Sequence, residues 1–467
     1  SCSWPAVARA AEPLRLWHAY RGREQQALGN LVQRWQEESG VEVELLAVPH
    51  DAFAAKLGAA IPLGDGPDLF IDAHERLGSY LERKLVAPVG AALRAADRAV
   101  FHRRAIDAVT LQGEIFGVPL SEKCLALFYR TDMVIRPPST VEEMGEVLRA
   151  PLPPGGFLLA YESRSLYTHA TFLHAFGGRL LAADDSFGLV GPEAEASILY
   201  VKELVDRGVV PEAADGALVT RLFRSGKAPF AISGPWLVSD LDDAEVPYRV
   251  APLPKVASTG KPLMPLLTVE AVMLSPAGAG RAEAQSLARF LGSPEAAELR
   301  QRLARTVSTR SDVRLPAGDA LLEAFGAQAA QSVPMPTRVA MRAVWEPGEK
   351  ALRKVLAGTV GAPEALLEAR RRFDDVRRAL PPPVSPAPAL LLVGGLLLLG
   401  AWQLVRRARS ASFRAAVNAS KPAYAYVVHA VVALGLLVFV PLFAGAAISL
   451  YAGQPGSQHY VGLANFS

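Results

Sequence analysis

Near the start of the chain, the hydrophobic pattern changes from period two to helical spacing and back. Residues 14–18 alternate apolar and polar side chains and predict a strand. Apolar residues then recur at helical spacing through GREQQALGNLVQRWQEESG, with Gly40 as the stop. Residues 41–45 return to alternation. A strand, a helix of roughly 16 residues and another strand form a βαβ unit, so we expect a parallel opening sheet.

Strands and helices continue to alternate as far as about residue 380. Short apolar runs predict further strands at 69–71, 128–129 and 229–233. Helical spacing predicts helices at 75–84, 140–149, 192–207, 281–291, 294–304 and 363–379. This order of elements is typical of an α/β protein.

Beyond residue 380 the sequence contains two long apolar runs. A proline-rich spacer at 381–388 predicts an extended, semi-rigid linker. Residues 389–405 carry no charge, and residues 424–451 are apolar except for His429. Both runs approach the length needed to cross a hydrocarbon layer of about 30 Å, so we predict two transmembrane helices. The alternative for 389–405 is a buried core helix.

The orientation of these helices follows from the charge between them. Residues 406–423 contain basic side chains and no acidic one: Arg406, Arg407, Arg409, Arg414 and Lys421. Positive loops stay in the cytoplasm, so residues 11–380 are expected on the exported side of a bacterial inner membrane, with the helices among its lipids. Residues 8–10, Ala-Arg-Ala, fit a signal-peptidase site and predict residues 1–10 as a signal-peptide remnant.

Composition excludes several functions. The net charge is +3, from 49 basic and 46 acidic residues, and no basic run is interleaved with aromatics, so no nucleic-acid partner is expected. Cys2 and Cys124 lie too far apart in sequence to suggest a disulfide framework or a zinc site. Cys124 reads as a buried thiol, and lipidation of Cys2 stays open. No GxxxxGK[ST] loop occurs, so ATP hydrolysis is expected on another subunit. We predict no catalytic residue, metal or cofactor.

Polar and aromatic residues follow three of the predicted strands. Tyr20 and Arg21 come after the first strand, an Asp72–Arg76 stretch comes after Ile71, and Trp236 follows the strand at 229–233. Ligands of parallel α/β sheets bind at the carboxyl ends of strands, so these residues predict a binding cleft. Helix caps and surface loops are the alternative for each one alone.

Five segments, in order, carry a resemblance across residues 12–380. They are GDGPDLFIDAHERLGSYLERKLVAPV, GEIFGVPLSEKCLALFYRTDM, GKAPFAISGPW, MPTRVAMRAVW and AGTVGAPEALLEA. Together they resemble the maltose/maltodextrin-binding proteins of ABC sugar importers. The resemblance implies a two-lobed type II periplasmic-binding-protein fold that closes by a hinge around a sugar. The implied lobes cover about 12–121 with 265–330, and about 122–264 with 331–380.

The resemblance also implies ligand-binding residues. Glu75 and Arg76 match the acidic–basic pair that binds sugar hydroxyls. Tyr167 lies where a sugar-stacking tyrosine is expected. Trp236 and Trp345 match the two tryptophans that stack on sugar rings, with core packing as their alternative.

Departures from the family pattern leave the identity of the sugar open. Asp72 stands where the maltose binders carry an aromatic residue. Lys123 takes a glutamate position, and Tyr20 with Arg21 replaces a small–acidic pair. We keep all four as candidate ligand-binding residues. Another di- or oligosaccharide is therefore as good a candidate as maltose. Glu270 is a weaker candidate with a structural alternative.

The membrane part resembles a different component of the same importers. KPAYAYVVHAVVALGLLVFVPLFAGAAISLYAG, followed by YVGLANF, looks like the start of a sugar permease, with residues 452–467 as a truncated periplasmic segment. The sequence thus predicts a binding protein fused to a permease, which works with a second permease subunit and an ATP-binding cassette ATPase dimer. Two alternatives stay open. One is a membrane-tethered sugar sensor, and the other is a glycoside-processing enzyme that uses Glu75 and Asp72.

Overall fold

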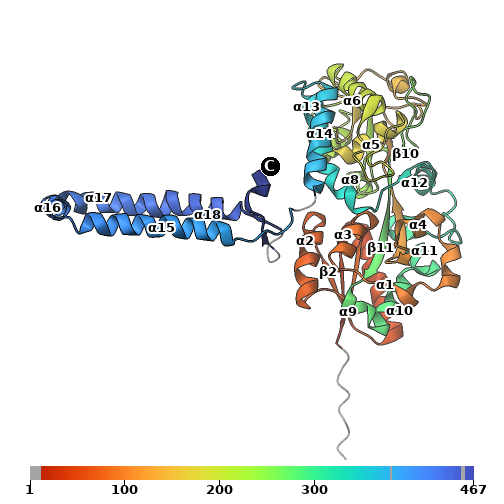
Figure 1. Cartoon of the computed structure of the whole chain (residues 1–467). Helices are drawn as coiled ribbons and strands as arrows, with labels where there is room; N and C mark the ends of the chain where they lie inside the picture. The colour runs from red at the N-terminus through yellow and green to blue at the C-terminus, as the bar shows by residue number, and fades with distance from the viewer. Residues whose placement is uncertain (1–11, 379–380, 454–457, 467) are drawn as a thin grey trace, which may run out of the picture. The chain divides into compact units, whose positions relative to one another are not determined.

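The computed structural model describes residues 12–378, 381–453 and 458–466 (Figure 1). The chain forms two compact units, and the boundary between them in the sequence lies between Arg377 and Arg378. The predicted signal-peptide remnant, including Cys2, lies outside the described residues. Parts of the predicted helix at 363–379 and of the segment at 452–467 also lie outside them.

The first sheet has the strand order β12-β6-β11-β3-β1-β2. The bounds of its strands are β1 Leu14–His18, β2 Val43–Ala47, β3 Leu69–Ala73, β6 Val118–Lys123, β11 Leu266–Leu274 and β12 Val307–Ser308, and β13 Val333–Pro334 also pairs with β11. β1 pairs in parallel with both β2 and β3, as the βαβ pattern predicts. β11 runs antiparallel to β3 and β6. The opening sheet is therefore parallel, with antiparallel additions from later in the chain.

Helices α1 (Gly22–Ser39), α10 (Ala282–Leu291) and α11 (Pro294–Ala304) cover this sheet. The predicted apolar stripe of α1 is buried, from Leu28 to Trp35. Gly40 ends α1 in the left-handed conformation with φ 72°, which glycine adopts without a steric cost. We call this sheet with α1, α10 and α11 the first body.

The second sheet has the order β10-β7-β9-β8. Its strands are β7 Ala126–Arg130, β8 Leu159–Ala160, β9 Phe230–Ser233 and β10 Tyr248–Ala251. Successive side chains of β7 face opposite sides, since Leu127 and Tyr129 enter one apolar cluster and Ala126 and Phe128 enter another. Helices cover both faces, and this sheet with its helices is the second body.

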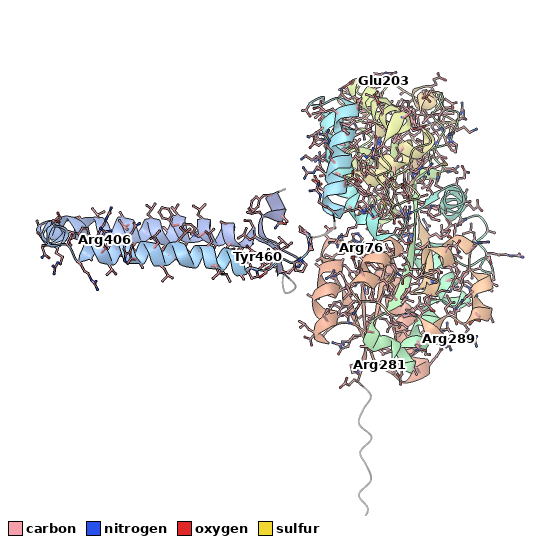
Figure 2. The ribbon with its side chains drawn as sticks, in the orientation of Figure 1. Arg76, Glu203, Arg281, Arg289, Arg406 and Tyr460 are labelled. Carbon is pink, nitrogen blue, oxygen red and sulfur yellow. The ribbon has the colours of Figure 1, made fainter. Side chains whose placement is uncertain are left out.

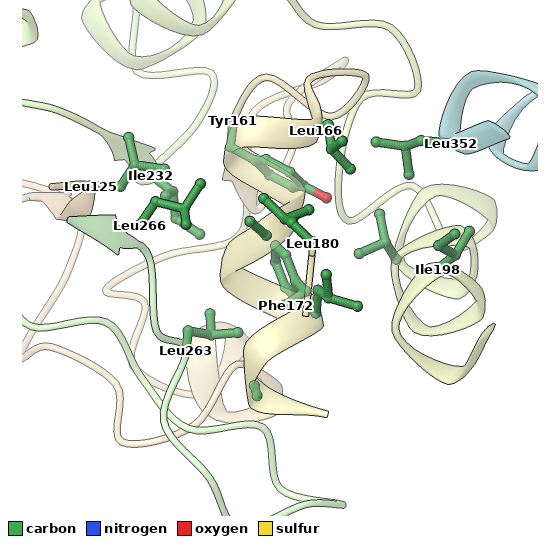
Figure 3. Close-up of a cluster of buried hydrophobic side chains, with 14 of the residues drawn as sticks. Leu125, Tyr161, Leu166, Phe172, Leu180, Ile198, Ile232, Leu263, Leu266 and Leu352 are labelled. Atoms are coloured by element: carbon green, nitrogen blue, oxygen red, sulfur yellow. The ribbon is translucent and has the colours of Figure 1, made fainter. Parts of the chain in front are cut away.

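The two faces of the second sheet carry different helices. One face packs against α5 (Leu166–Ala175), α6 (Gly191–Asp206), α13 (Trp345–Leu356) and α14 (Ala362–Arg377). Figure 3 shows part of this cluster, where Phe172 lies among Tyr161, Leu180 and Ile198. The other face packs against α7 (Gly216–Arg224), α8 (Leu237–Asp243) and α12 (Ala320–Ala330).

The packing of α12 bears on the lobe limits. The implied first lobe included residues up to 330, yet Leu322 and Phe325 of α12 pack in the cluster that contains Phe128 of β7. The ring of Phe325 meets that of Phe128 edge-on, with centroids 6.0 Å apart. We therefore propose that α12 moves with the second lobe.

The remaining short elements of the first unit lie between these strands and helices along the chain. They are α2 His50–Ala60, α3 Leu77–Glu82, α4 Arg103–Ala108, α9 Pro276–Ala279, β4 Thr110–Leu111, β5 Glu114–Ile115, and the 3₁₀ turns Ile61–Leu63, His74–Arg76, Gly90–Ala92, Ala95–Val100, Glu142–Gly145 and Val339–Ala343. Many of them pack on one of the two bodies, as Phe53 of α2 does on the first and Met144 does on the second.

The prediction of a helix over 140–149 is wrong. Only Glu142–Gly145 coils there, as a 3₁₀ turn. The Glu143 carboxylate accepts the Ser139 N–H at 2.6 Å, and the Lys255 N–H donates to the Ser139 carbonyl. A helix would direct the Glu143 N–H to the Ser139 carbonyl, but the Lys255 N–H occupies that carbonyl and the Glu143 N–H donates to the Thr140 hydroxyl instead.

The second unit consists mostly of helices: α15 Ala387–Ala408, α16 Ala411–Ala419, α17 Lys421–Leu434, a π-helical turn Gly435–Phe439, and α18 Val440–Ile448. Within the described residues, two stretches, Ala387–Ala408 and Tyr426–Ile448, are long and apolar enough to cross a membrane. The predicted spacer is shorter than expected because α15 already begins at Ala387. The predicted basic loop contains α16.

Past α18, the chain folds back on the spacer. β14 (Tyr451–Ala452) and β15 (His459–Tyr460) pair antiparallel, and a 3₁₀ turn covers Gly462–Phe466. The Val384 N–H donates to the Tyr460 carbonyl at 2.9 Å. The spacer is thereby bonded to the segment that follows the second apolar stretch.

Candidate functional site

The carboxyl end of β3 carries the densest group of predicted site residues. β3 runs directly into the 3₁₀ turn His74–Arg76. Figure 2 shows Arg76 between the body that carries Arg281 and Arg289 and the body that carries Glu203. The polar side chains of this turn therefore lie at the edge of the first sheet that faces the second body.

Asp72 differs from the prediction because it lies inside β3 and is buried, with 4% of its surface exposed. The Tyr80 hydroxyl donates a hydrogen bond to its Oδ2, and Arg76 Nη1 lies 3.2 Å from the same oxygen. Burial and the Asp72 charge raise the pKa of Tyr80, so its phenol keeps the proton that it donates. We interpret Asp72 as a residue that holds Arg76 in place rather than one that contacts a ligand.

Arg76 has a second partner. Its Nη2 lies 2.8 Å from Nε2 of His50, at the start of α2. Burial and the nearby guanidinium lower the pKa of His50, so its imidazole is neutral and accepts this hydrogen bond. Asp72 and His50 together fix the direction of the Arg76 side chain.

Glu75 is the least satisfied charged group of the site. Its Oε2 is buried and has no hydrogen-bond partner among the described residues. Burial, with a further contribution from the Asp72 charge, raises the pKa of Glu75 to about 7. The backbone N–H of Glu75 bonds to its carboxyl group, but a desolvated oxygen without a donor is ready to accept hydrogen bonds from a ligand.

Tyr167 lies in the first turn of α5, where the charge of Glu75 acts on its phenol and the Thr268 side chain bonds to it. Burial raises the pKa of Tyr167, which therefore stays a neutral donor and acceptor. The structure thus brings Tyr167 of the second body close to the turn that carries Glu75.

Lys123 belongs to a separate cluster at the end of β6. Its Nζ lies 2.6 Å from Glu24 of α1 and 2.9 Å from Glu270 of β11, and 5.3 Å from the centre of the Tyr20 ring. Burial alone would lower the Lys123 pKa, but the two carboxylates outweigh it and raise that pKa. Lys123, Glu270 and Tyr20 are therefore mutually satisfied. Arg21 is exposed at the N-terminus of α1, outside this cluster.

Trp236 stands at the N-terminus of α8 with 51% of its surface exposed. Its ring lies against the backbone of Gly234, where a Cβ atom would come within 2.2 Å of the ring. Gly234 is therefore needed for this orientation of the ring. Trp345 begins α13 and packs partly against the second-body core, so part of its surface already serves packing.

The ligand-binding residues predicted from the sequence included neither His74, although it lies in the Asp72–Arg76 stretch, nor Glu24. His74 is fully buried; its Nδ1 accepts the Val269 N–H at 2.9 Å and its Nε2 lies 3.0 Å from the Met335 carbonyl. Burial lowers the pKa of His74 to about 4, so the neutral ring donates through Nε2. His74 thus joins the site turn to β11 and to Met335. Glu24 lies in the first turn after β1, and its position at a strand end was the available signal.

Cys124 is the cysteine that the structure describes, and its thiol is not activated. Cys124 is buried, and burial raises the pKa of its thiol to about 12. Among the described residues, no group of three His, Cys, Asp or Glu side chains could hold a metal ion. The site instead offers hydrogen-bonding groups and an exposed aromatic face.

Comparisons with known proteins agree with this geometry. Residues 30–319 match the family model described as bacterial extracellular solute-binding protein. The chain is 28% identical over 255 residues to a maltotriose-binding protein of Pyrococcus abyssi, an alignment that spans 54% of this chain and only 55% of that protein. It is 24% identical over 358 residues to a galactooligosaccharide-binding protein of Bacillus subtilis, which covers 72% of this chain and 83% of that protein.

A solved structure shares the fold. The maltotriose-binding protein of Thermus thermophilus, bound to maltotriose, superposes with a TM-score of 0.72 at 22% identity. The match covers 78% of this chain and 99% of that structure. The two sheets with their helices are therefore arranged as in a type II periplasmic sugar-binding protein.

Proposed function

Because the chain belongs to the bacterial extracellular solute-binding proteins, we propose that it is the sugar-capturing component of an ABC-type importer. Its first unit binds an oligosaccharide between the two bodies and closes on it by a hinge. Its second unit anchors it in the inner membrane and begins a permease. The observation that carries the proposal is the buried, unpartnered Oε2 of Glu75 at a strand end that faces the second body.

The side chains around Glu75 suit a neutral sugar. Glu75 accepts hydroxyl hydrogen bonds, and the fixed guanidinium of Arg76 donates them. The exposed ring of Trp236 offers a flat apolar face for a pyranose ring, and Tyr167 and Trp345 add partly exposed aromatic surface. In this proposal Asp72 and Lys123 support the site, because both are engaged by neighbouring side chains.

Maltotriose is the first ligand to test, since related proteins are described as binding maltotriose or galactooligosaccharides. The full chain in detergent is titrated calorimetrically with maltotriose and with a galactotriose. We expect saturable binding of at least one of them. Trp236→Ala should weaken binding at least tenfold, the loss expected when roughly 1.4 kcal/mol of stacking is removed.

Leu367→Ala is a matched control for the tryptophan variant. Leu367 on α14 is 50% exposed, nearly the same as Trp236, so its truncation removes a similarly exposed apolar side chain away from the site turn. It should leave the affinity unchanged. Absence of binding by any oligosaccharide, or an equal loss in both variants, would contradict the proposed site.

A glycoside-processing enzyme fits the site less well. Such an enzyme needs two free carboxyl groups on either side of the scissile bond. Asp72, the second candidate carboxylate, is bonded to Tyr80 and Arg76. Incubation with maltotriose should therefore leave the trisaccharide intact.

The tether is the part of the proposal that concerns transport. A short linker holds the binding unit at a high effective concentration near its permease, up to the millimolar range. A protease site inserted at Pro383 tests this in reconstituted vesicles that contain the whole permease begun by this chain, the second permease subunit and the ATPase. Cleavage should lower uptake when the released binding unit is dilute, and unchanged uptake would contradict the role of the tether.

A further inference from the structure

Away from Glu75, the two bodies also meet where α1 approaches α8. Leu28, Leu31 and Val32 anchor α1 in the core of the first body. Leu237 and Leu241 anchor α8 in the core of the second body. The two helices therefore move with different bodies.

The contact between α1 and α8 is direct. A Cβ atom on Gly22 would lie 3.8 Å from the Ser239 hydroxyl, so the first turn of α1 touches the middle of α8. Beside this contact is an open cavity of about 530 Å³ lined by Gly22, Arg23, Gln25, Gln26, Ser239 and Asp243. The first turn of α1 therefore contacts α8, and an open space lies beside the contact.

The Asp242 carboxylate of α8 interacts with side chains from both bodies. Arg23 Nη1 of α1 lies 2.9 Å from Asp242 Oδ2, and Arg305 Nη1 lies 3.8 Å from the same oxygen. Within the second body, the Tyr248 hydroxyl donates to Asp242 Oδ1 at 2.8 Å. Tyr248 therefore holds the carboxylate in place on its own body, and the two arginines bind its other oxygen.

The backbone at Arg305 supports this arrangement. Arg305 follows α11 in the left-handed conformation, with φ 50° and ψ 45°, which a residue with a side chain adopts rarely. Its guanidinium also approaches Asp319 at the N-terminus of α12, with 3.9 Å between Nε and Oδ2. Arg305 thus interacts with two acidic residues on helices that pack on the second body.

We propose that Asp242 is a closure latch: the Arg23 and Arg305 side chains bind its carboxylate only when α8 lies against α1, so the ion pair adds to sugar affinity without contacting the sugar. This rests on the proposed function, since it requires the two bodies to separate by a hinge. α8 then has two roles, with Trp236 facing the ligand at its N-terminus and Asp242 binding the other body near its C-terminus.

The expected change in sugar affinity follows from the solvent exposure of the paired side chains. The Arg23 and Asp242 side chains are 39% and 23% exposed. Partly exposed ion pairs contribute up to about 1 kcal/mol, which is a factor of about five in affinity. Contacts made only in the closed state shift the open–closed equilibrium and change the apparent affinity by that factor.

The test uses the full chain in detergent with maltotriose as the probe, at low and high NaCl. Arg23→Gln should raise the Kd by up to about fivefold at low salt, and Asp242→Asn should raise it at least as much, because it also removes the partner of Arg305. The double variant should raise the Kd no further than Asp242→Asn does. The wild-type Kd should rise with salt more steeply than that of either variant. Arg103→Gln, which removes an exposed arginine from an ion pair within α4, is the control and should change nothing.

A second measurement needs no ligand. Spin labels at Arg98→Cys in the first body and Glu203→Cys in the second, in a Cys2→Ser background, report the distance between the bodies. Cys124 is buried and stays unlabelled. Asp242→Asn should shift the distance distribution of the sugar-free protein towards longer distances.

The outcomes separate the two proposals. Unchanged distances and unchanged Kd in both variants, or additive losses in the double variant, overturn the latch. If wild type binds no oligosaccharide but Asp242→Asn still lengthens the distances, the latch stands and the proposed ligand class fails.

Discussion

Replacing Glu75 by glutamine should stabilise the sugar-free protein and weaken its binding of the sugar. The pKa of Glu75 is raised to about 7 from an ordinary value of 4.5, with burial as the main cause and the Asp72 charge as a second one. The folded state therefore binds the Glu75 proton more tightly than the unfolded state. Between pH 4.5 and 7 the unfolded chain carries fewer protons at this site, so stability falls as pH rises.

The magnitude follows from the difference in pKa. A difference of about 2.5 units at about 1.36 kcal/mol each makes ionised Glu75 cost the folded state roughly 3 kcal/mol above pH 7. Glutamine has the same shape and cannot ionise. The free energy of unfolding of Glu75→Gln should equal that of wild type near pH 4.5 and exceed it by roughly 3 kcal/mol at pH 8.

The assay is urea unfolding of both proteins in detergent, followed by circular dichroism from about pH 4.5 to 8. Glu114→Gln, at an exposed position on β5, is the control and should show no pH-dependent difference from wild type. A Glu75→Gln protein that is no more stable than wild type at pH 8 would refute the account of a desolvated, unpartnered carboxylate.

Ligand binding tests the ionisation of Glu75 independently of stability. Hydroxyl donors from a sugar favour the ionised carboxylate, so binding at pH 7 should release protons from wild type. Calorimetry in buffers with different ionisation enthalpies measures that release. Glu75→Gln should release none through this group and should bind at least tenfold more weakly, since roughly 1.5 kcal/mol or more is lost with a hydrogen bond to a charged group. Proton uptake by wild type would contradict the role assigned to Glu75.

Three further changes probe the rest of the site. Gly234→Ala should force the ring of Trp236 out of its place and lower maltotriose affinity by calorimetry; unchanged affinity would contradict the stacking role. Asp72→Asn should weaken binding in wild type but not in an Arg76→Gln background, because it acts through the guanidinium; equal losses in both backgrounds would make Asp72 a direct ligand. Lys123→Met should lower the free energy of unfolding by roughly 3 kcal/mol in urea, because it leaves two carboxylates without their partner; a loss near zero would contradict a buried pair.

Much of the fold was predictable because the residues that become buried recur along the sequence with the period of a helix or of a strand. The stripe from Leu28 to Trp35 predicts α1, and alternation in residues 14–18 predicts β1. The turn at 142–145 was not predictable, because bonds to Ser139 from a residue more than a hundred positions later decide it. The local pattern of apolar residues contains no information about such distant hydrogen-bond partners.

The candidate site divides in the same way. The sequence predicted that Glu75 and Trp236 follow strands, since the local pattern of apolar residues shows where a strand ends. The ion pair between Lys123 and Glu270 could not be predicted, because Glu270 lies 147 residues away in sequence. Asp72 reads as a strand-end ligand until Tyr80 is seen to bond to it.

These pairings also bear on the charge of the ligand. Arg76 and Lys123, two of the three cations of the first body that were candidates for binding, already lie beside carboxylates, and the third, Arg21, is exposed outside both clusters. An anionic sugar would have to displace a carboxylate from one of them, and separating a partly buried pair leaves an uncompensated charge. The unsatisfied group is an acceptor, Glu75, which hydroxyls can reach without breaking any pair. We therefore expect neutral oligosaccharides to bind more tightly than uronic acids of the same size. A uronate trisaccharide that displaced maltotriose at equal concentration would contradict this reasoning.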